Sequence, residues 1–176
     1  MISMPDYTSI HFWIHQLAAQ DMASLGDSEI NCNHMVMAAC GLDRALSQAP
    51  KGTPKEPMRH QVNRIENAFA AVSIKPGRLS ERLRAQLTTG NHQFPSGRSV
   101  MIKLAPGVGE LSPRAYAMAN PSEPEGAHFL AAALEKNTPE LTTALDSLGI
   151  KPAVLIDALF TASGEPRSLW KKVFKS

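Results

Sequence analysis

The chain lacks several features that would indicate a location or a partner directly. None of its 176 residues belongs to an apolar run of about 20, the length that spans a bilayer, and no basic segment leads into an apolar stretch near the N-terminus. The net charge is only +2, from 18 basic and 16 acidic residues, so the basic field of a nucleic-acid binder is absent. We therefore expect a cytoplasmic protein that binds neither nucleic acid nor membranes.

Motifs of familiar catalytic or cofactor chemistry are also missing. The sequence has no Gly-x-x-x-x-Gly-Lys-Ser/Thr phosphate loop and no Gly-x-Ser-x-Gly motif. The two cysteines, Cys32 and Cys40, would lie about 12 Å apart on one helix, too far for a disulfide. His11 and His15 have the spacing of metal ligands, but no third ligand is identifiable. We therefore expect no enzyme activity, no cofactor and no metal site.

Apolar residues recur every three or four positions along most of the chain, which is the spacing of amphipathic helices. This spacing occurs over residues 10–25, 33–46, 58–72, 79–87, 127–134, 139–148 and 152–160. Residues 100–105 are expected to form a further short helix, and Ser112 followed by Pro113 is typical of a helix start. No alternating run indicates a strand, so the predicted fold class is all-α.

Comparison of the chain with itself reveals an internal repeat. Residues 74–76 and 150–152 both read Ile-Lys-Pro, and leucines follow three and seven residues after each proline, Pro76 and Pro152. Upstream of each corner lies an apolar helix led by a histidine, His34 in the first half and His128 in the second. We expect these histidines to bond to a neighbouring turn, which is a structural role repeated by duplication.

The repeat predicts how the domain is organised. Two four-helix repeats, over about residues 8–89 and 98–161, are expected to pack about a pseudo-twofold axis. Together they would form one compact domain over residues 1–165. The remaining residues, 166–176, are expected to form a basic amphipathic tail.

This order of motifs resembles the double repeat at the N-terminus of Clp-family protein unfoldases. In that family a histidine-led apolar helix is followed by a helix that ends in Leu-Gly-Val/Ile and then by a last helix. Residues 127–130, Ala-His-Phe-Leu, and residues 148–150, Leu-Gly-Ile, match this pattern most closely, whereas the first half has Ser73 where glycine is usual. The resemblance implies a module, free-standing or excised without the AAA+ motor, that catalyses nothing. It would bind substrates or adaptor proteins for an ATP-dependent unfoldase or protease.

Two other functions remain open. The first is an accessory of a bacterial secretion apparatus of the type VI kind, which would bind a helix of another component. The second is a helical enzyme of unrecognised type that would use His11, His15 or His34. A groove without convergent polar groups would favour binding, whereas a pocket that gathers a histidine and a carboxylate would favour the enzyme.

Two features suggest which residues of the domain bind a partner. Met22, Met35 and Met37 would suit an adaptable peptide groove, although ordinary core filling is the simpler interpretation. Arg78 and Arg82 belong to a basic stretch that would either face an acidic partner or form a solvated helix surface.

The tail is a third candidate. Trp170 and Phe174 share one apolar face of a helix that Pro166 can open, and four basic residues occupy the rest. Eleven residues are marginal as an isolated helix in water, so the apolar face must pack on something. We expect the tail to dock on its own domain, with a neighbouring copy or a partner as the alternatives.

Overall fold

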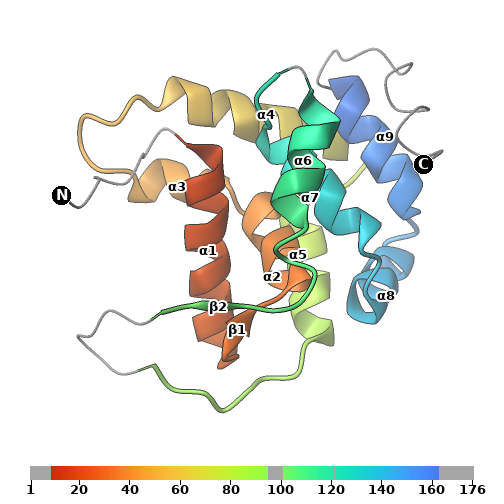
Figure 1. Cartoon of the computed structure of the whole chain (residues 1–176). Helices are drawn as coiled ribbons and strands as arrows, with labels where there is room; N and C mark the ends of the chain where they lie inside the picture. Colours follow the sequence, from red (N-terminus) through yellow and green to blue (C-terminus); the bar gives the residue numbers. More distant parts are fainter. Residues whose placement is uncertain (1–8, 95–100, 121, 163–176) are drawn as a thin grey trace.

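Figure 1 shows the computed structural model of the chain, in which residues 9–94, 101–120 and 122–162 are described. Within these residues the chain forms nine helices, and the predicted all-α class is confirmed. The helices are α1 (Ile10–Leu25), α2 (Cys32–Cys40), α3 (Asp43–Gln48), α4 (Glu56–Ala71), α5 (Pro76–Gln86), α6 (Leu111–Ala119), α7 (Gly126–Glu135), α8 (Pro139–Ser147) and α9 (Pro152–Ala162). No helix in this part of the chain is both long enough and apolar enough to cross a bilayer.

The only strands among the described residues form a minimal parallel pair, β1 (Glu29–Ile30) and β2 (Lys103–Leu104). The pair crosses the lower end of α1 in Figure 1. The expectation of a helix over residues 100–105 is therefore wrong, as is the expectation that the chain has no strand. Pro106 stops the segment after a few residues, too soon for a helix. The backbone groups of residues 103–104 are satisfied by pairing with β1 and not by helical hydrogen bonds.

The helix predicted over residues 33–46 is divided in two. It begins earlier, because Asn31 caps α2 through its side chain. Gly41 then ends α2, and α3 begins two residues later. The break also leaves room for a side chain, since a Cβ at position 41 would lie only 2.8 Å from Nε of Arg44. The turn at Gly41 therefore directs Arg44 back across the end of α2.

The centre of the molecule is the contact between α2 and α7. All nine residues of α2 are buried, as are nine of the ten residues of α7. On either side α1 packs on α2 and α6 packs on α7. Farther out, α4 packs on α9 and α5 packs on α8. If each helix of one half is exchanged for its equivalent in the other half, this set of helix–helix contacts is reproduced. The pseudo-twofold axis itself stays a prediction.

The two repeat histidines have matching contacts. His34 and His128 each stand at the third position of a central helix, α2 or α7. Nδ1 of His34 accepts a hydrogen bond from the backbone N–H of Asn31 at 3.0 Å, and Nδ1 of His128 accepts one from Glu125 at 2.9 Å. Each ring therefore closes the first turn of its helix by satisfying a donor just outside it.

The two Ile-Lys-Pro corners also share one geometry. Ser73 ends α4 with a φ of 61°, and Gly149 ends α8 with a φ of 69°. Beyond each of them the isoleucine N–H donates to a carbonyl five residues back, at 3.1 Å in the first corner and 3.0 Å in the second. Pro76 and Pro152 then occupy the first positions of α5 and α9, where a missing N–H costs nothing.

Candidate functional site

Three cavities lined by described residues are considered as candidate sites. The largest of the three is an open cleft of about 690 Å³. It lies between the C-terminal end of α2, the short helix α3, the second half of α4 and the length of α5, and Asp21 of α1 also lines it. Its apolar lining includes the buried Ala39, Cys40, Leu42, Val62 and Ile65 and the more exposed Ala70, Ile74 and Pro76, which are the apolar side chains that a ligand can contact directly. Its charged lining consists of Asp21, Asp43, Arg44, Glu66, Lys75 and Arg84. The cleft therefore joins an apolar floor to charged walls.

A buried carboxylate holds two arginines at this cleft. Asp21 projects from α1 and is only 2% exposed. Nη1 and Nη2 of Arg44 donate to its two oxygens at 3.0 and 2.7 Å, and Nη2 of Arg84 donates to Oδ1 at 2.9 Å. Arg44 also donates through Nε to the carbonyl of Gly41, and Arg84 through Nη1 to Oγ of Ser24. These bonds join α1, α3 and α5, and the hydrogen bonds that Arg44 donates to Asp21 raise the pKa of Arg44.

The two arginines keep donors that the described residues do not use. A guanidinium carries five N–H groups, and Arg44 uses three of them while Arg84 uses two. The side chains remain 37% and 42% exposed. At the rim Lys75 is exposed and pairs with no acidic residue of the described part of the chain. The cleft therefore offers hydrogen-bond donors beside an apolar floor.

The thiol in the cleft wall is not set up for nucleophilic chemistry. Burial raises the pKa of Cys40, so that at neutral pH it is a thiol and not the reactive thiolate. Burial also raises the pKa of Cys32 at the other end of α2. Both cysteines are free, in agreement with the prediction that they form no disulfide.

A second pocket, of about 480 Å³, gathers a histidine with carboxylates. His11, Glu123 and Glu125 are among its lining residues. Nε2 of His11 lies 3.1 Å from Oγ of Ser112, but Ser112 does not line the pocket. Glu125 is engaged in an ion pair with Arg64. Among the described residues no carboxylate contacts His11, so no acidic group orients the His11–Ser112 pair, and only the histidine of that pair reaches this cavity.

A third, shallow groove of about 520 Å³ runs between α1 and β2 and is largely apolar. Beside it Met101, Ile102 and Leu104 are 91%, 41% and 46% exposed. Adjacent exposed apolar side chains are typical of protein-binding surfaces. This groove is therefore the second place at which a partner could bind.

The methionines singled out in the sequence lie in the core. Met22, Met35 and Met37 are at most 2% exposed, and none of them lines any of the three cavities. They cannot touch a partner unless the core rearranges. The hypothesis of a methionine-lined groove therefore finds no support in this conformation, and the simpler interpretation of core filling describes their positions.

The basic candidates are exposed but stand outside the cleft. Arg78 pairs with Glu81 one turn later on α5, at 3.3 Å, and Arg82 has no ion pair among the described residues. Neither arginine lines any of the three cavities described above. Trp170 and Phe174 lie outside the described residues.

The sequence does not single out Asp21 and Arg44, and it indicates Arg84 only as a member of the basic stretch that also holds Arg78 and Arg82. One signal was available, because Asp21 stands four residues after Leu17 and four before Leu25, on the apolar face of its helix. A carboxylate there must be paired when buried. Its partners could not be read off the sequence, since they lie 23 and 63 residues away.

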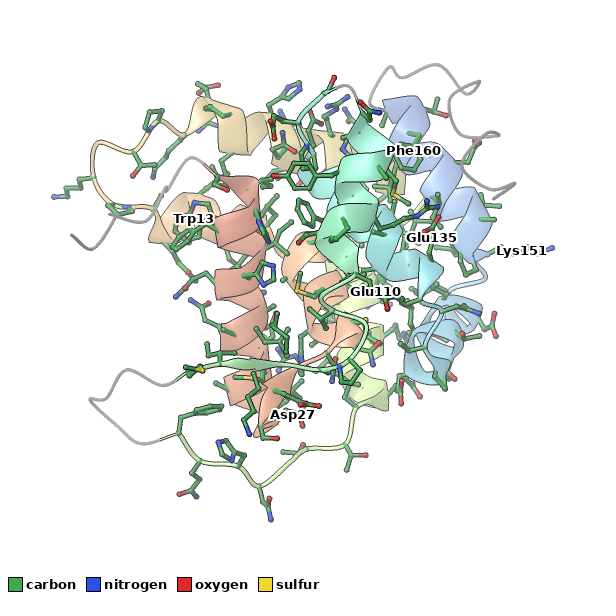
Figure 2. The ribbon with its side chains drawn as sticks, in the orientation of Figure 1. Trp13, Asp27, Glu110, Glu135, Lys151 and Phe160 are labelled. Carbon is green, nitrogen blue, oxygen red and sulfur yellow. The ribbon has the colours of Figure 1, made fainter. Side chains whose placement is uncertain are left out.

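Other groups of residues do not form a metal site. Within the described residues no cluster of three or more His, Cys, Asp or Glu side chains could hold a metal ion. At the lower end of α1 in Figure 2, Asp27 approaches Nε2 of His34, with Oδ2 at 3.0 Å. That pair belongs to the helix cap already described.

No protein-family model matches the sequence, and no curated protein matches it significantly.

Proposed function

We propose that the chain is a non-enzymatic protein-binding module of the Clp N-terminal type, which takes up a peptide segment in the cleft between α2, α3, α4 and α5. The single observation that carries this proposal is the lining of that cleft. An apolar floor can bury ligand side chains, while the N–H groups of Arg44 and Arg84 can hold ligand carbonyl or carboxylate oxygens. Such a module would recruit substrates or adaptor proteins for an ATP-dependent unfoldase or protease.

The repeated architecture supports the same proposal. The histidine-capped helices α2 and α7 lie at the centre, and each is followed by a corner with a left-handed residue before Ile-Lys-Pro. This arrangement agrees with the order of motifs that resembles the Clp N-terminal repeats. The chemistry of the cleft points the same way, because the thiol of Cys40 is held protonated by its raised pKa.

Filling the cleft tests this function. Ala70 is exposed on α4 and lines the cleft, whereas the next residue, Ala71, is exposed and does not. The probe is fluorescently labelled casein, an unfolded protein, whose binding to the full chain is followed by fluorescence anisotropy. We expect Ala70→Trp to weaken binding about tenfold, which corresponds to the loss of a few apolar contacts, and Ala71→Trp to leave it unchanged. If the chain shows no binding at millimolar concentration, the proposed function is wrong.

The groove between α1 and β2 favours a second candidate, an accessory of a secretion apparatus that binds a component helix. Its apolar lining beside exposed Ile102 and Leu104 would suit the apolar face of an amphipathic helix. The variant Ile102→Asp distinguishes the two sites. Loss of binding in this variant together with full binding in Ala70→Trp would place the partner in the groove and not in the cleft.

The pocket around His11 keeps the enzyme as a third candidate, since it gathers a histidine with Glu123. Burial lowers the pKa of His11, which leaves a neutral ring able to accept a proton. Hydrolysis of p-nitrophenyl acetate by the full chain that is lost in both His11→Gln and Ser112→Ala would favour this function. Equal background hydrolysis in all three proteins would count against it.

A further inference from the structure

We propose that the cleft selects peptide segments that carry a carboxylate, and that Arg44 and Arg84 form the carboxylate-binding pair. This inference rests on the proposed function, because it names the chemistry of the segment that the cleft would take up. Its starting point is an unequal charge balance at the wall of the cleft. Two guanidinium groups share one carboxylate, that of Asp21, so the three side chains together keep one positive charge.

The arginine pair is rigidly held before any ligand arrives. Arg44 makes three hydrogen bonds, to both oxygens of Asp21 and to the carbonyl of Gly41. Its guanidinium lies against Gly41 so closely that a Cβ there would stand 2.8 to 3.2 Å from three of its atoms. Arg84 is held between Asp21 and Ser24. A donor group that is already ordered loses little conformational freedom on binding.

The donors that remain match an anion better than a neutral group. Two N–H groups of Arg44 and three of Arg84 have no acceptor among the described residues, and both side chains reach solvent. Arginine N–H groups bind carboxylates in pairs of parallel hydrogen bonds, and Arg84, whose Nε–H is free within the described residues, keeps donors for such a pair. Arg44 gives its own parallel pair to Asp21, so its two free N–H groups, on opposite edges of the guanidinium, can each add a single bond. One carboxylate balances the net positive charge that Arg44, Arg84 and Asp21 keep together.

The rim of the cleft contains charges of both signs. Lys75, just before α5, adds a positive charge that has no acidic partner in the described part of the chain. Asp43 and Glu66 add negative charges, but both are exposed, so that water and salt screen them. The charged lining is balanced overall, with three residues of each sign, so the preference for a carboxylate rests on the free N–H groups of Arg44 and Arg84 and not on the net charge of the cleft.

The test uses one heptapeptide framework, Gly-Leu-Val-Ala-Xaa-Leu-Ala, with a dye at its N-terminus and binding to the full chain read by fluorescence anisotropy. Four versions are compared: Xaa as Glu with an amidated C-terminus, as Gln with an amidated C-terminus, as Gln with a free C-terminal carboxylate, and as phosphoserine with an amidated C-terminus. We expect one or both carboxylate versions to bind about tenfold more tightly than the neutral peptide, since hydrogen bonds to charged groups are the stronger ones. The arm that gains affinity tells whether the cleft takes a side-chain or a terminal carboxylate.

A matched pair of variants places the carboxylate in the cleft. Lys75 and Lys151 occupy the same position of the two Ile-Lys-Pro corners, both are exposed, and only Lys75 lines the cleft. Figure 2 shows Lys151 pointing away from the molecule. We expect Lys75→Glu to weaken binding of the preferred carboxylate peptide several-fold and to change binding of the neutral peptide little, with Lys151→Glu like the unaltered chain. Neither variant removes a buried contact, so both should fold.

Each outcome separates this inference from the function on which it rests. Equal binding of all four peptides would overturn carboxylate selection while leaving peptide binding intact. Tightest binding of the phosphoserine peptide would overturn it in favour of phosphate. Identical behaviour of the Lys75→Glu and Lys151→Glu variants would show that the carboxylate binds elsewhere. Failure of every peptide and of casein would refute the proposed function together with the inference.

Discussion

Exchanging the residues at the two Ile-Lys-Pro corners should change stability in opposite directions. Ser73 and Gly149 end α4 and α8 in the left-handed region, at φ values of 61° and 69°, and the isoleucine after each makes the same hydrogen bond. In that region a residue with a Cβ is strained by about 1–2 kcal/mol, whereas glycine is not. Glycine loses more freedom on folding, which offsets about 0.5–1 kcal/mol of this advantage.

The net effect follows from these two opposing contributions. Ser73→Gly should stabilise the domain by about 0.5–1 kcal/mol, and Gly149→Ser should destabilise it by a similar amount. The second change is not complicated by crowding, because a Cβ at Gly149 would meet nothing within 4 Å. For a chain of this size the expected change of the melting temperature is about 1–4 °C in each direction.

Thermal unfolding followed by circular dichroism measures both variants and the double exchange. The double variant should melt near the unaltered chain, since the two corners lie in different halves and their effects should add. The matched control is Ser80→Gly inside α5, where the same chemical change should destabilise the helix by about 0.5 kcal/mol. A Ser73→Gly variant that melts below the unaltered chain would refute the assignment of strain to this corner.

Three further changes test the buried network, a buried histidine and the tail. Asp21→Asn should lower the melting temperature by about 5–10 °C. The buried group loses its charge while two half-exposed arginines stay beside it, which costs about 2–3 kcal/mol. A shift below 1 °C would contradict the role of the network. Burial, and second the charge of His11, lower the pKa of His15 from 6.5 to about 4. Between these pH values the unfolded chain binds a proton that the folded chain does not. The free energy of unfolding should therefore fall by about 2 kcal/mol, after allowance for partial exposure, as the pH drops from about 6.5 to 4. In urea titrations His15→Gln should reduce part of this fall, and an unchanged dependence of stability on pH would contradict the prediction. Deletion of residues 166–176 should lower the melting temperature by several degrees if the tail docks on its own domain, and an unchanged melt with freely exchanging amides would show that it does not.

Helix positions followed closely from local patterns. The spacing of apolar residues predicts one helix over residues 10–25, and α1 spans Ile10–Leu25 and ends at Gly26 in the left-handed region. The same spacing predicts a helix over residues 139–148, which is α8, and the side chain of Thr138 caps it by accepting a hydrogen bond from the N–H of Leu141. These features depend on residues within one or two turns, so the spacing of apolar residues and the caps are sufficient to predict them.

Segments that depend on distant partners were predicted wrongly or not at all. Ser112 and Pro113 predict a helix start, but α6 begins at Leu111, one residue before Ser112, and has no side-chain cap. Residues 103–104 are too few to show a period, and they became a strand only because β1 lies beside them, more than 70 residues earlier in the chain. The backbone N–H and C=O groups of such a short exposed segment form hydrogen bonds with whichever segment the tertiary structure places beside them.

The sequence by itself determined that the chain is helical, where most of its helices lie, and that the same histidine and Ile-Lys-Pro elements occur twice. These properties follow from hydrophobic periodicity and from backbone preferences of proline and glycine, which act locally. Only the tertiary structure decided that Asp21 meets Arg44 and Arg84, and that α3, α4 and α5 leave a cleft beside them. A buried charge needs opposite charge within a few ångströms, and which residues supply it depends on how helices pack rather than on their order in the chain.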